Sequence, residues 1–184
     1  AIVRGASRRV GVNRILEALP AEERAALGRC LRPMRHEVRD LVFAQGERVT
    51  TVVFPLSGVF SLVVEADGAE AVEIATVGHE GFVGLPVFLG TDRTSAQAFA
   101  QVPGPAYRMT ADAFRTAVDR LPELTRVLHR YTQALFTLVA QNSGCNRKHS
   151  MVQRCARWIL LCHDRVGRDE FSITHHVLSQ MLGV

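Results

Sequence analysis

The spacing of hydrophobic residues changes its period along the chain, and each change marks a different kind of element. Over residues 13–31 apolar residues recur at helical spacing on both sides of a turn at Pro20. Over residues 37–109 the period is two, and turn residues interrupt it about every ten positions. Helical spacing returns after Thr110, a good N-cap, and again after Pro122, which suits a first helical turn. The pattern predicts short helices, then a β-domain, then further helices.

The middle of the chain carries the clearest strand pattern. The segments 51–54, 59–64 and 71–76 are rich in Val, Phe, Ile and Thr, and turns that contain Gly, Pro or Asp separate them. Many short strands at even spacing predict a sandwich or barrel of the jelly-roll kind. We therefore expect an α+β fold, in which residues 1–121 form the cap helices and a β-roll.

A regular hydrophobic seam occupies residues 122–145. Its positions advance alternately by four and three residues for three heptads, which predicts a long dimerisation helix with a break at residues 142–144. A second apolar row, Val127, Ala134 and Val139 with Phe136 nearby, could face the β-domain. The alternative is a helix packed wholly within one chain. The positions predicted to form the dimer interface are Leu124, Leu128, Tyr131, Leu135, Leu138, Asn142 and Cys145.

The last part of the chain predicts the start of a winged helix-turn-helix. A helix over about 150–163 is followed by a turn, a short strand at 171–173 and a further helix that begins after Thr174. The sequence ends at Val184, where a recognition helix is expected to start. Residues 146–184 are therefore interpreted as an incomplete DNA-binding domain, and we expect the motif to continue.

Composition and charge exclude several classes of protein. The 184 residues are 47% hydrophobic, which is enough for a sizeable core and excludes a disordered or collagen-like chain. No apolar run approaches a membrane span and no secretory signal is evident, so a cytoplasmic protein without a membrane partner is expected. The four cysteines match no zinc or iron-sulfur cassette. Residues 36–109 carry nine acidic and four basic side chains, whereas residues 143–184 carry three and six, so the end of the chain favours a polyanion.

The order of these parts, together with residues 152–160 and 171–184, resembles the cyclic-AMP receptor and fumarate-nitrate regulator (Crp/Fnr) family of transcription factors. The turn at 55–58 and the loop at 78–84 also resemble positions of this family. The resemblance implies a sensory β-roll like a cyclic nucleotide-binding domain, a homodimer joined by the long helix, and a winged helix that reads a palindromic operator. It also implies RNA polymerase as a further partner.

The resemblance places an effector site in the loop between residues 84 and 96. Cyclic-nucleotide binders of the family have a glutamate after the glycine, for the ribose hydroxyl, but Leu85 stands here. An arginine with adjacent hydroxyl residues, suited to an anion, is present. We therefore expect that cyclic AMP does not bind, and both another small effector and no effector remain open. The candidate effector residues are Gly84, Leu85, Arg93, Thr94 and Ser95.

Iron-based sensing finds little support in the sequence. Only Cys30 precedes residue 145, so the N-terminal cysteine cluster of iron-sulfur sensors is absent, and single histidines such as His36, His79 and His129 are more typical of surface or hydrogen-bonded roles than of haem ligation. We predict no metal and no cofactor. An enzyme of the cupin type would need His-x-His in a strand, which is absent, so no catalytic residues are expected.

The sequence therefore predicts a non-enzymatic regulator that binds double-stranded DNA as a homodimer. The first helix of the motif crosses the DNA backbone, so its residues position the protein on phosphates and the next helix reads bases. A dimeric sensor or adaptor without DNA-binding function is the alternative. The candidate DNA-positioning residues are Thr174, His175, Ser179 and Gln180.

Overall fold

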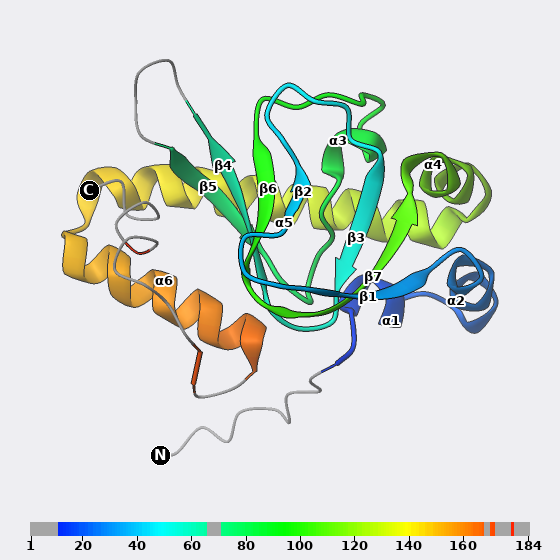
Figure 1. The fold of residues 1–184 in the computed structure, drawn as a ribbon, viewed down its shortest axis with the longest axis horizontal. Coiled ribbons are helices and arrows are strands. Elements are labelled where there is room, and N and C mark those ends of the chain that lie inside the picture. Colours follow the sequence, from blue (N-terminus) through cyan, green and yellow to red (C-terminus); the bar gives the residue numbers. More distant parts are fainter. Residues whose placement is uncertain (1–10, 66–70, 168–169, 172–177, 179–184) are drawn as a thin grey trace.

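The computed structural model describes residues 11–65, 71–167, 170–171 and 178 and shows two antiparallel sheets with helices around them (Figure 1). The sheets have the strand orders β1-β7-β3 and β2-β6-β4-β5. This architecture confirms the α+β class with an N-terminal β-domain and C-terminal helices. In chain order the elements are α1 (Arg14–Glu17), α2 (Ala21–Gly28), β1 (Arg32–His36), β2 (Leu41–Phe43), β3 (Thr51–Pro55), β4 (Val59–Val64), β5 (Val72–Val77), α3 (Leu85–Phe88), β6 (Gln97–Val102), β7 (Gly104–Thr110), α4 (Ala111–Arg120), α5 (Pro122–Lys148) and α6 (Met151–Val166).

The two N-terminal helices form where helical spacing predicts them. The side chain of Asn13 caps α1 by accepting hydrogen bonds from the backbone N–H groups of Ile15 and Leu16. Pro20 separates α1 from α2, as expected from its missing N–H. The apolar residues of this segment close one end of the β-domain core, because Ile15, Leu16, Leu19 and Leu27 are all buried.

The first strand begins earlier than the sequence pattern indicates. β1 starts at Arg32, whereas the two-residue period is visible only from Glu37. The segment Arg32–His36 carries mostly polar and charged residues, and it becomes a strand because it pairs antiparallel with β7 over five residues. Pairing with a distant segment overrides local propensity here.

The centre of the β-domain is a cluster of aromatic rings from several elements. The rings of Phe54 and Phe82 are stacked with centroids 5.9 Å apart, and Phe114 of α4 lies 5.5 Å from Phe82. Phe60 of β4 is also fully buried. Such rings provide a large part of the buried apolar surface of a domain this size.

The strand β4 is apolar on both faces, because the main core covers one face and α6 covers the other. Phe60 points into the main core, while Val59 and Val63 point to the opposite face of the sheet. On that second face they pack against Trp158 and Cys162 of α6. An antiparallel sheet usually leaves one face to water, so the apolar outer face of β4 reflects the docking of α6.

The long helix α5 exceeds the predicted length. Thr110 caps α4 as expected, and α5 then runs for 27 residues to Lys148, without the break predicted at residues 142–144. One helical glycine costs only about 1 kcal/mol, and Asn142 is held by a hydrogen bond to the Ile74 carbonyl. α5 ends at Lys148, with His149 as its C-cap, because Ser150 is the N-cap of α6 and forms a capping box.

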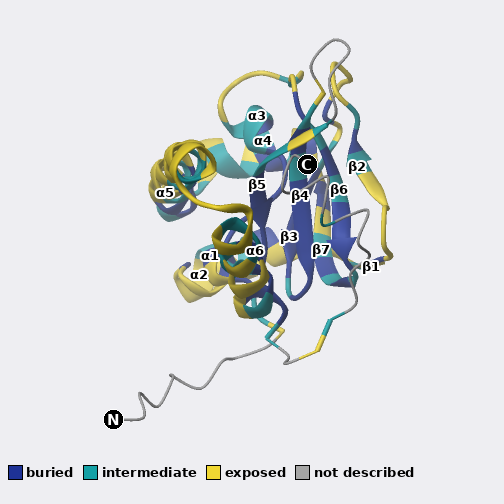
Figure 2. Ribbon diagram, turned by 90° about the vertical axis from the view of Figure 1, so that its left-hand side faces the viewer, coloured by how far each residue is buried: buried dark blue, intermediate teal, exposed yellow. Residues whose placement is uncertain are grey.

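Helix α6 turns back beneath α5 in the view of Figure 1 and ends at Gly167 in the left-handed conformation, with φ of 68°. Figure 2 shows buried residues concentrated on the strands and exposed ones on the outer sides of α5 and α6. No helix in the described ranges is long and apolar enough to cross a membrane. The predicted strand at 171–173 and the helix after Thr174 lie almost entirely outside the described residues, as do Thr174, His175, Ser179 and Gln180.

Candidate functional site

The first half of the predicted effector loop is built into the core. Gly84 is buried with φ of 126°, and a Cβ atom there would lie 2.9 Å from Cγ2 of Val52, so only glycine fits. Leu85 follows as the first residue of α3 and is half-buried. An apolar side chain therefore occupies the position at which nucleotide binders of the resembled family carry a glutamate.

The second half of the loop is held against the β2–β3 connection. The guanidinium of Arg93 is exposed and donates to the carbonyl of Gly46 at 2.7 Å. The hydroxyl of Thr94 accepts from the backbone N–H of Ala96 at 3.1 Å, and Ser95 is exposed. One Arg93 nitrogen and the Thr94 hydroxyl thus have backbone partners, which weakens the case for a preformed phosphate site.

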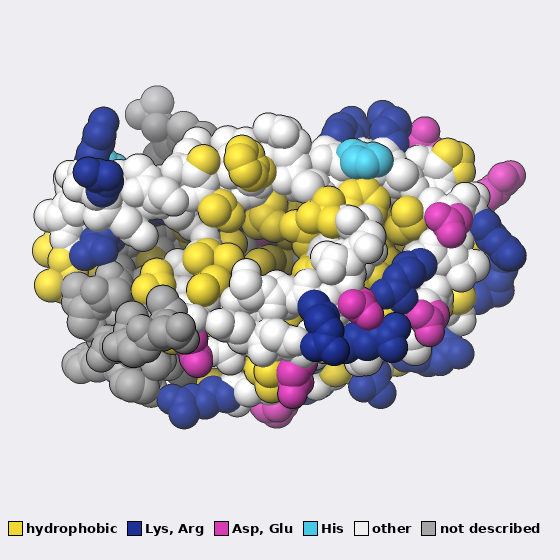
Figure 3. Space-filling model, turned by 90° about the horizontal axis from the view of Figure 1, so that it is seen from above, with side chains coloured by type: hydrophobic (Ala, Val, Ile, Leu, Met, Phe, Trp, Pro, Cys, Tyr) yellow, Lys and Arg dark blue, Asp and Glu magenta, His cyan; other side chains and the backbone are white. Residues whose placement is uncertain are grey.

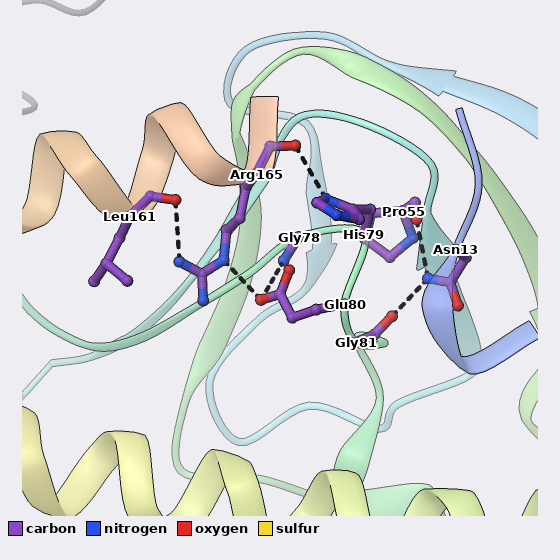
Figure 4. Close-up of polar contacts among 8 residues, drawn as sticks. All are labelled: Asn13, Pro55, Gly78, His79, Glu80, Gly81, Leu161 and Arg165. Carbon is purple, nitrogen blue, oxygen red and sulfur yellow. Dashed lines mark hydrogen bonds and ion pairs between the residues drawn. The ribbon is translucent and has the colours of Figure 1, made fainter. Parts of the chain in front are cut away.

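A different cluster joins segments far apart in the chain, and its centre is the loop of residues 78–81 (Figure 4). The side-chain amide of Asn13 donates to the carbonyls of Pro55 at 2.9 Å and Gly81 at 2.8 Å. The backbone N–H of Arg14 donates to the carbonyl of His79 at 2.8 Å. We call this loop the junction loop, because it fixes α1 to the β-domain and also contacts α6.

The C-terminal turn of α6 is the other partner of the junction loop. Nε of the buried Arg165 donates to Oε1 of Glu80 at 2.7 Å, and its second guanidinium contact is the Leu161 carbonyl at 3.2 Å. A ring nitrogen of His79 lies 3.3 Å from the Arg165 carbonyl (Figure 4). A Cβ atom on Gly78 would lie 2.5 Å from Cγ of Arg165, so the close approach of α6 requires glycine there.

A second anchor holds the middle of α6 on the outer face of the sheet. Nε1 of Trp158 donates to Oε1 of Glu73 at 2.9 Å, and the hydroxyl of Ser61 donates to Oε2 at 2.6 Å. Gln101 also bonds to Ser61. Burial beneath α6 raises the pKa of Glu73 to about 7, and the two hydrogen bonds only partly oppose this rise.

The long helix reaches the junction loop through Tyr131. Its ring lies 5.3 Å from that of Phe82, and a Cβ atom on Gly81 would lie 2.3 Å from it. Burial raises the pKa of the Tyr131 hydroxyl, and the backbone of Phe82 partly opposes this rise. The junction loop therefore contacts α1, α5 and α6 together.

The predicted seam of α5 faces the chain's own β-domain. Leu124 and Leu128 have an exposed fraction of 0% and belong to the main core, and Leu135 is 8% exposed. Within one chain these two side chains have no exposed surface, and their assignment to a dimer interface stays a prediction. The rest of the seam is half-buried, and within it Tyr131 packs on the junction loop. The half-buried positions are Tyr131, Leu138, Asn142 and Cys145.

The second apolar row behaves differently from the expectation. Val127 is buried in the core as proposed, but Ala134 is exposed and Val139 is half-buried. Phe136 is 70% exposed. The exposed apolar side chains of α5 thus centre on Phe136. Each residue turns the helix by about 100°, so Phe136 points away from the buried side chain of its neighbour Leu135.

Comparisons with known proteins identify the fold. Residues 34–120 match the family model of the cyclic nucleotide-binding domain. A search of curated proteins finds no match. Among solved structures, the c-di-GMP-responsive global regulator CLP of Xanthomonas campestris is 15% identical, with a TM-score of 0.67 over 89% of this chain and 85% of that one.

Two further regulators match at similar levels. A transcriptional regulator of the Crp/Fnr family from Eubacterium rectale is 13% identical, with a TM-score of 0.72 over 92% of this chain and 80% of that one. FixK2 of Bradyrhizobium japonicum is 13% identical, with a TM-score of 0.68 over 84% and 78%. The chain has a Crp/Fnr-like fold. At these identities the likeness establishes the architecture.

Within this Crp/Fnr-like fold, no set of three or more His, Cys, Asp or Glu side chains in the described ranges could hold a metal ion. None of the four cysteines is part of a disulfide. Sequence reasoning missed Asn13, Glu73 and Arg165 as functional candidates. A charged residue inside an apolar strand, as at Glu73, was the available signal, but its partner Trp158 lies 85 residues away and is found only in the folded chain.

Proposed function

We propose that this protein is a DNA-binding transcriptional regulator whose β-domain controls the position of α6, the first helix of the DNA-binding part. The observation that carries the proposal is the docking of α6 on the β-domain through two separate anchors, Trp158 on Glu73 and Arg165 on Glu80. A signal that alters either anchor changes how the following residues are presented to DNA. The Crp/Fnr-like fold supports this reading.

The regulator acts as a homodimer through the exposed face of α5. Phe136 is 70% exposed at the middle of a 27-residue helix, and Val139 lies on the same face. Two copies of such a face bury each other on a two-fold axis, which presents two DNA-binding parts about one turn of DNA apart. The buried seam then packs within each subunit and does not form the interface between subunits.

The DNA-binding part adds positive charge at the end of the chain. Residues 143–184 have a net charge of +3 per subunit, and exposed Arg147 and Lys148 close α5. The predicted DNA-positioning residues, from Thr174 onward, remain part of the proposal. The association constant for DNA should fall steeply with salt. For each phosphate contacted, its decimal logarithm should fall by about 0.9 when the salt concentration rises tenfold.

The experiment is titration of the full natural protein against a selected palindromic duplex and a scrambled duplex of equal length at several salt concentrations. Tighter binding to the palindrome supports sequence-specific regulation. Equal affinity for both duplexes would instead favour the dimeric adaptor that does not read DNA. Variant Arg147→Gln should reduce the salt dependence, and Arg115→Gln on α4 is the matched control.

The effector of this regulator is not cyclic AMP. The half-buried Leu85 offers no acceptor for a ribose hydroxyl, and Arg93 already bonds the Gly46 carbonyl. Calorimetry should detect no cyclic AMP binding tighter than about 100 μM, which corresponds to roughly 5 kcal/mol. A dissociation constant well below about 100 μM would refute this part of the proposal.

A further inference from the structure

A cavity of about 380 Å³ lies where α1, α5 and α6 meet beside the junction loop. Ligand sites in proteins have volumes of roughly 300–1,000 Å³. Arg165 forms its α6 wall and Glu80 its junction-loop wall, while Arg14 and Arg130 lie at its opening. The cavity is therefore complete only while α6 is docked.

Positive charge dominates the opening of this cavity. Arg165 is neutralised by its ion pair with Glu80 at 2.7 Å. By contrast, the side chains of Arg14 and Arg130 make no hydrogen bond or ion pair within the described residues. Two guanidinium groups with open donors on one cavity favour an anionic group, which they can hold by charge-assisted hydrogen bonds.

The interior of the cavity combines an apolar wall from α5 with the polar residues Tyr131 of α5 and Glu80 of the junction loop. Val127, Leu135 and Leu138 line it from α5. Tyr131 also lines it, while the hydroxyl oxygen of this residue is buried against the junction loop at Gly81. This lining suits the apolar body of a small molecule.

We propose that this cavity binds a small organic anion, a carboxylate or phosphate ester with an apolar body. The anionic group lies between Arg14 and Arg130, and the body packs on the α5 leucines. The site differs from the predicted effector loop, because Gly84 and Arg93 do not line the cavity.

Dimerisation through Phe136 leaves the cavity open. Ala134, at its rim, lies about 200° around α5 from Phe136 because each residue turns the helix by 100°. The ligand also stabilises the docked state of α6, since Arg165 completes the wall, and a ligand that binds one state shifts the population toward it. This last consequence rests on the proposed function, whereas the site itself does not.

The test uses octanoate and phenyl phosphate as anionic probes, with octanol and octylamine as neutral and cationic controls, titrated calorimetrically into the whole chain. We expect both anions to bind with dissociation constants below about 1 mM, and octanol and octylamine to bind at least tenfold more weakly. Equal binding of octanoate and octanol, or no binding of either anion, overturns the proposal.

Three variants locate the site. Arg130→Met should weaken octanoate binding by roughly tenfold, as expected for the loss of one charge-assisted contact, whereas Arg126→Met, an exposed arginine of α5 that does not line the cavity, should leave it within twofold. Ala134→Phe fills the rim and should abolish binding while the protein stays folded. Equal losses in both arginine variants, or undiminished binding to Ala134→Phe, would place the probe elsewhere and refute the site.

A separate readout distinguishes the site from its regulatory role. Trp158 is the only tryptophan, and it lies on the face of α6 that packs against the sheet, so its emission reports docking. With octanoate bound, the emission of Trp158 should stay at the shorter wavelengths of a buried indole as pH is raised. Calorimetric binding without any effect on this emission or on DNA affinity would refute the coupling, and failure of DNA binding alone would refute the proposed function and leave the cavity site standing.

Discussion

Raising the pH from 5 to 8 should weaken the docking of α6, because the carboxyl of Glu73 is buried beneath Trp158. Burial raises its pKa from 4.5 to about 7 in the docked state. When α6 leaves, the carboxyl meets water and its pKa returns toward the ordinary value. The docked state therefore binds the proton more tightly, and this contribution is fully present below pH 4.5 and is lost as pH rises toward 7 and beyond.

The size of the effect follows from the two pKa values. A difference of about 2.5 units corresponds to about 3 kcal/mol between the limits of low and high pH, at 1.36 kcal/mol per unit. Between pH 6 and pH 8 the docking equilibrium should change by roughly tenfold. The charged groups that face Glu73 include Arg165, whose positive charge favours the ionised carboxyl and limits the rise in pKa.

The fluorescence of Trp158 measures this equilibrium directly. Undocking exposes the indole and breaks its hydrogen bond to Glu73, so its emission should shift to longer wavelength as pH rises. Glu73→Gln keeps an oxygen that can accept from Trp158 but cannot titrate, and its emission should be independent of pH in this range. Asp119→Asn removes an exposed carboxylate of α4 and serves as the control.

The reasoning fails if Glu73→Gln shows the same pH response as the unaltered chain. It also fails if the emission of the unaltered chain is constant from pH 5 to pH 8 while denaturant still shifts it. Hydrogen exchange of the α6 amides at both pH values separates undocking from unfolding of the whole chain.

Three further predictions follow from the packing. Phe136→Glu should give folded monomers in sedimentation. Leu128→Ala should lower the free energy of unfolding by about 2–5 kcal/mol without changing the oligomeric state. Monomers from Leu128→Ala together with dimers from Phe136→Glu would contradict this prediction. Gly78→Ala should red-shift the tryptophan emission, since its Cβ would overlap α6, while Gly28→Ala, where nothing lies within 4 Å, should not. Asn13→Ala should lower the stability in urea by about 2–4 kcal/mol, because a cap and two buried hydrogen bonds are lost; a change below about 0.5 kcal/mol would contradict this.

Much of the chain's local structure could be predicted from residue spacing and caps. Thr110 caps α4, Pro20 separates α1 from α2, and the period of two marks the strands β3, β4 and β5. These features depend on a few neighbouring residues, so the sequence contains all the information they need. Recognition of the Crp/Fnr-like order of parts depended on the same local signals.

The candidate site resisted prediction for the opposite reason. The bonds between Trp158 and Glu73 and between Arg165 and Glu80 each join residues 85 apart in the chain. Nothing local to any one of these residues specifies its partner. Asn13, which ties α1 to the junction loop over a separation of 68 residues, was hidden in the same way.

The long helix shows most clearly where local pattern stops and tertiary structure decides. The sequence alone determined that α5 is a helix with a heptad seam, because a 4-3 spacing places those side chains on one face of any helix. Only the fold decided what covers that face: Leu124 and Leu128 pack into their own β-domain, and the exposed apolar surface of α5 centres on Phe136. The physical reason is that burial lowers the free energy of an apolar stripe equally well against the same chain or a second copy, so periodicity cannot distinguish the two.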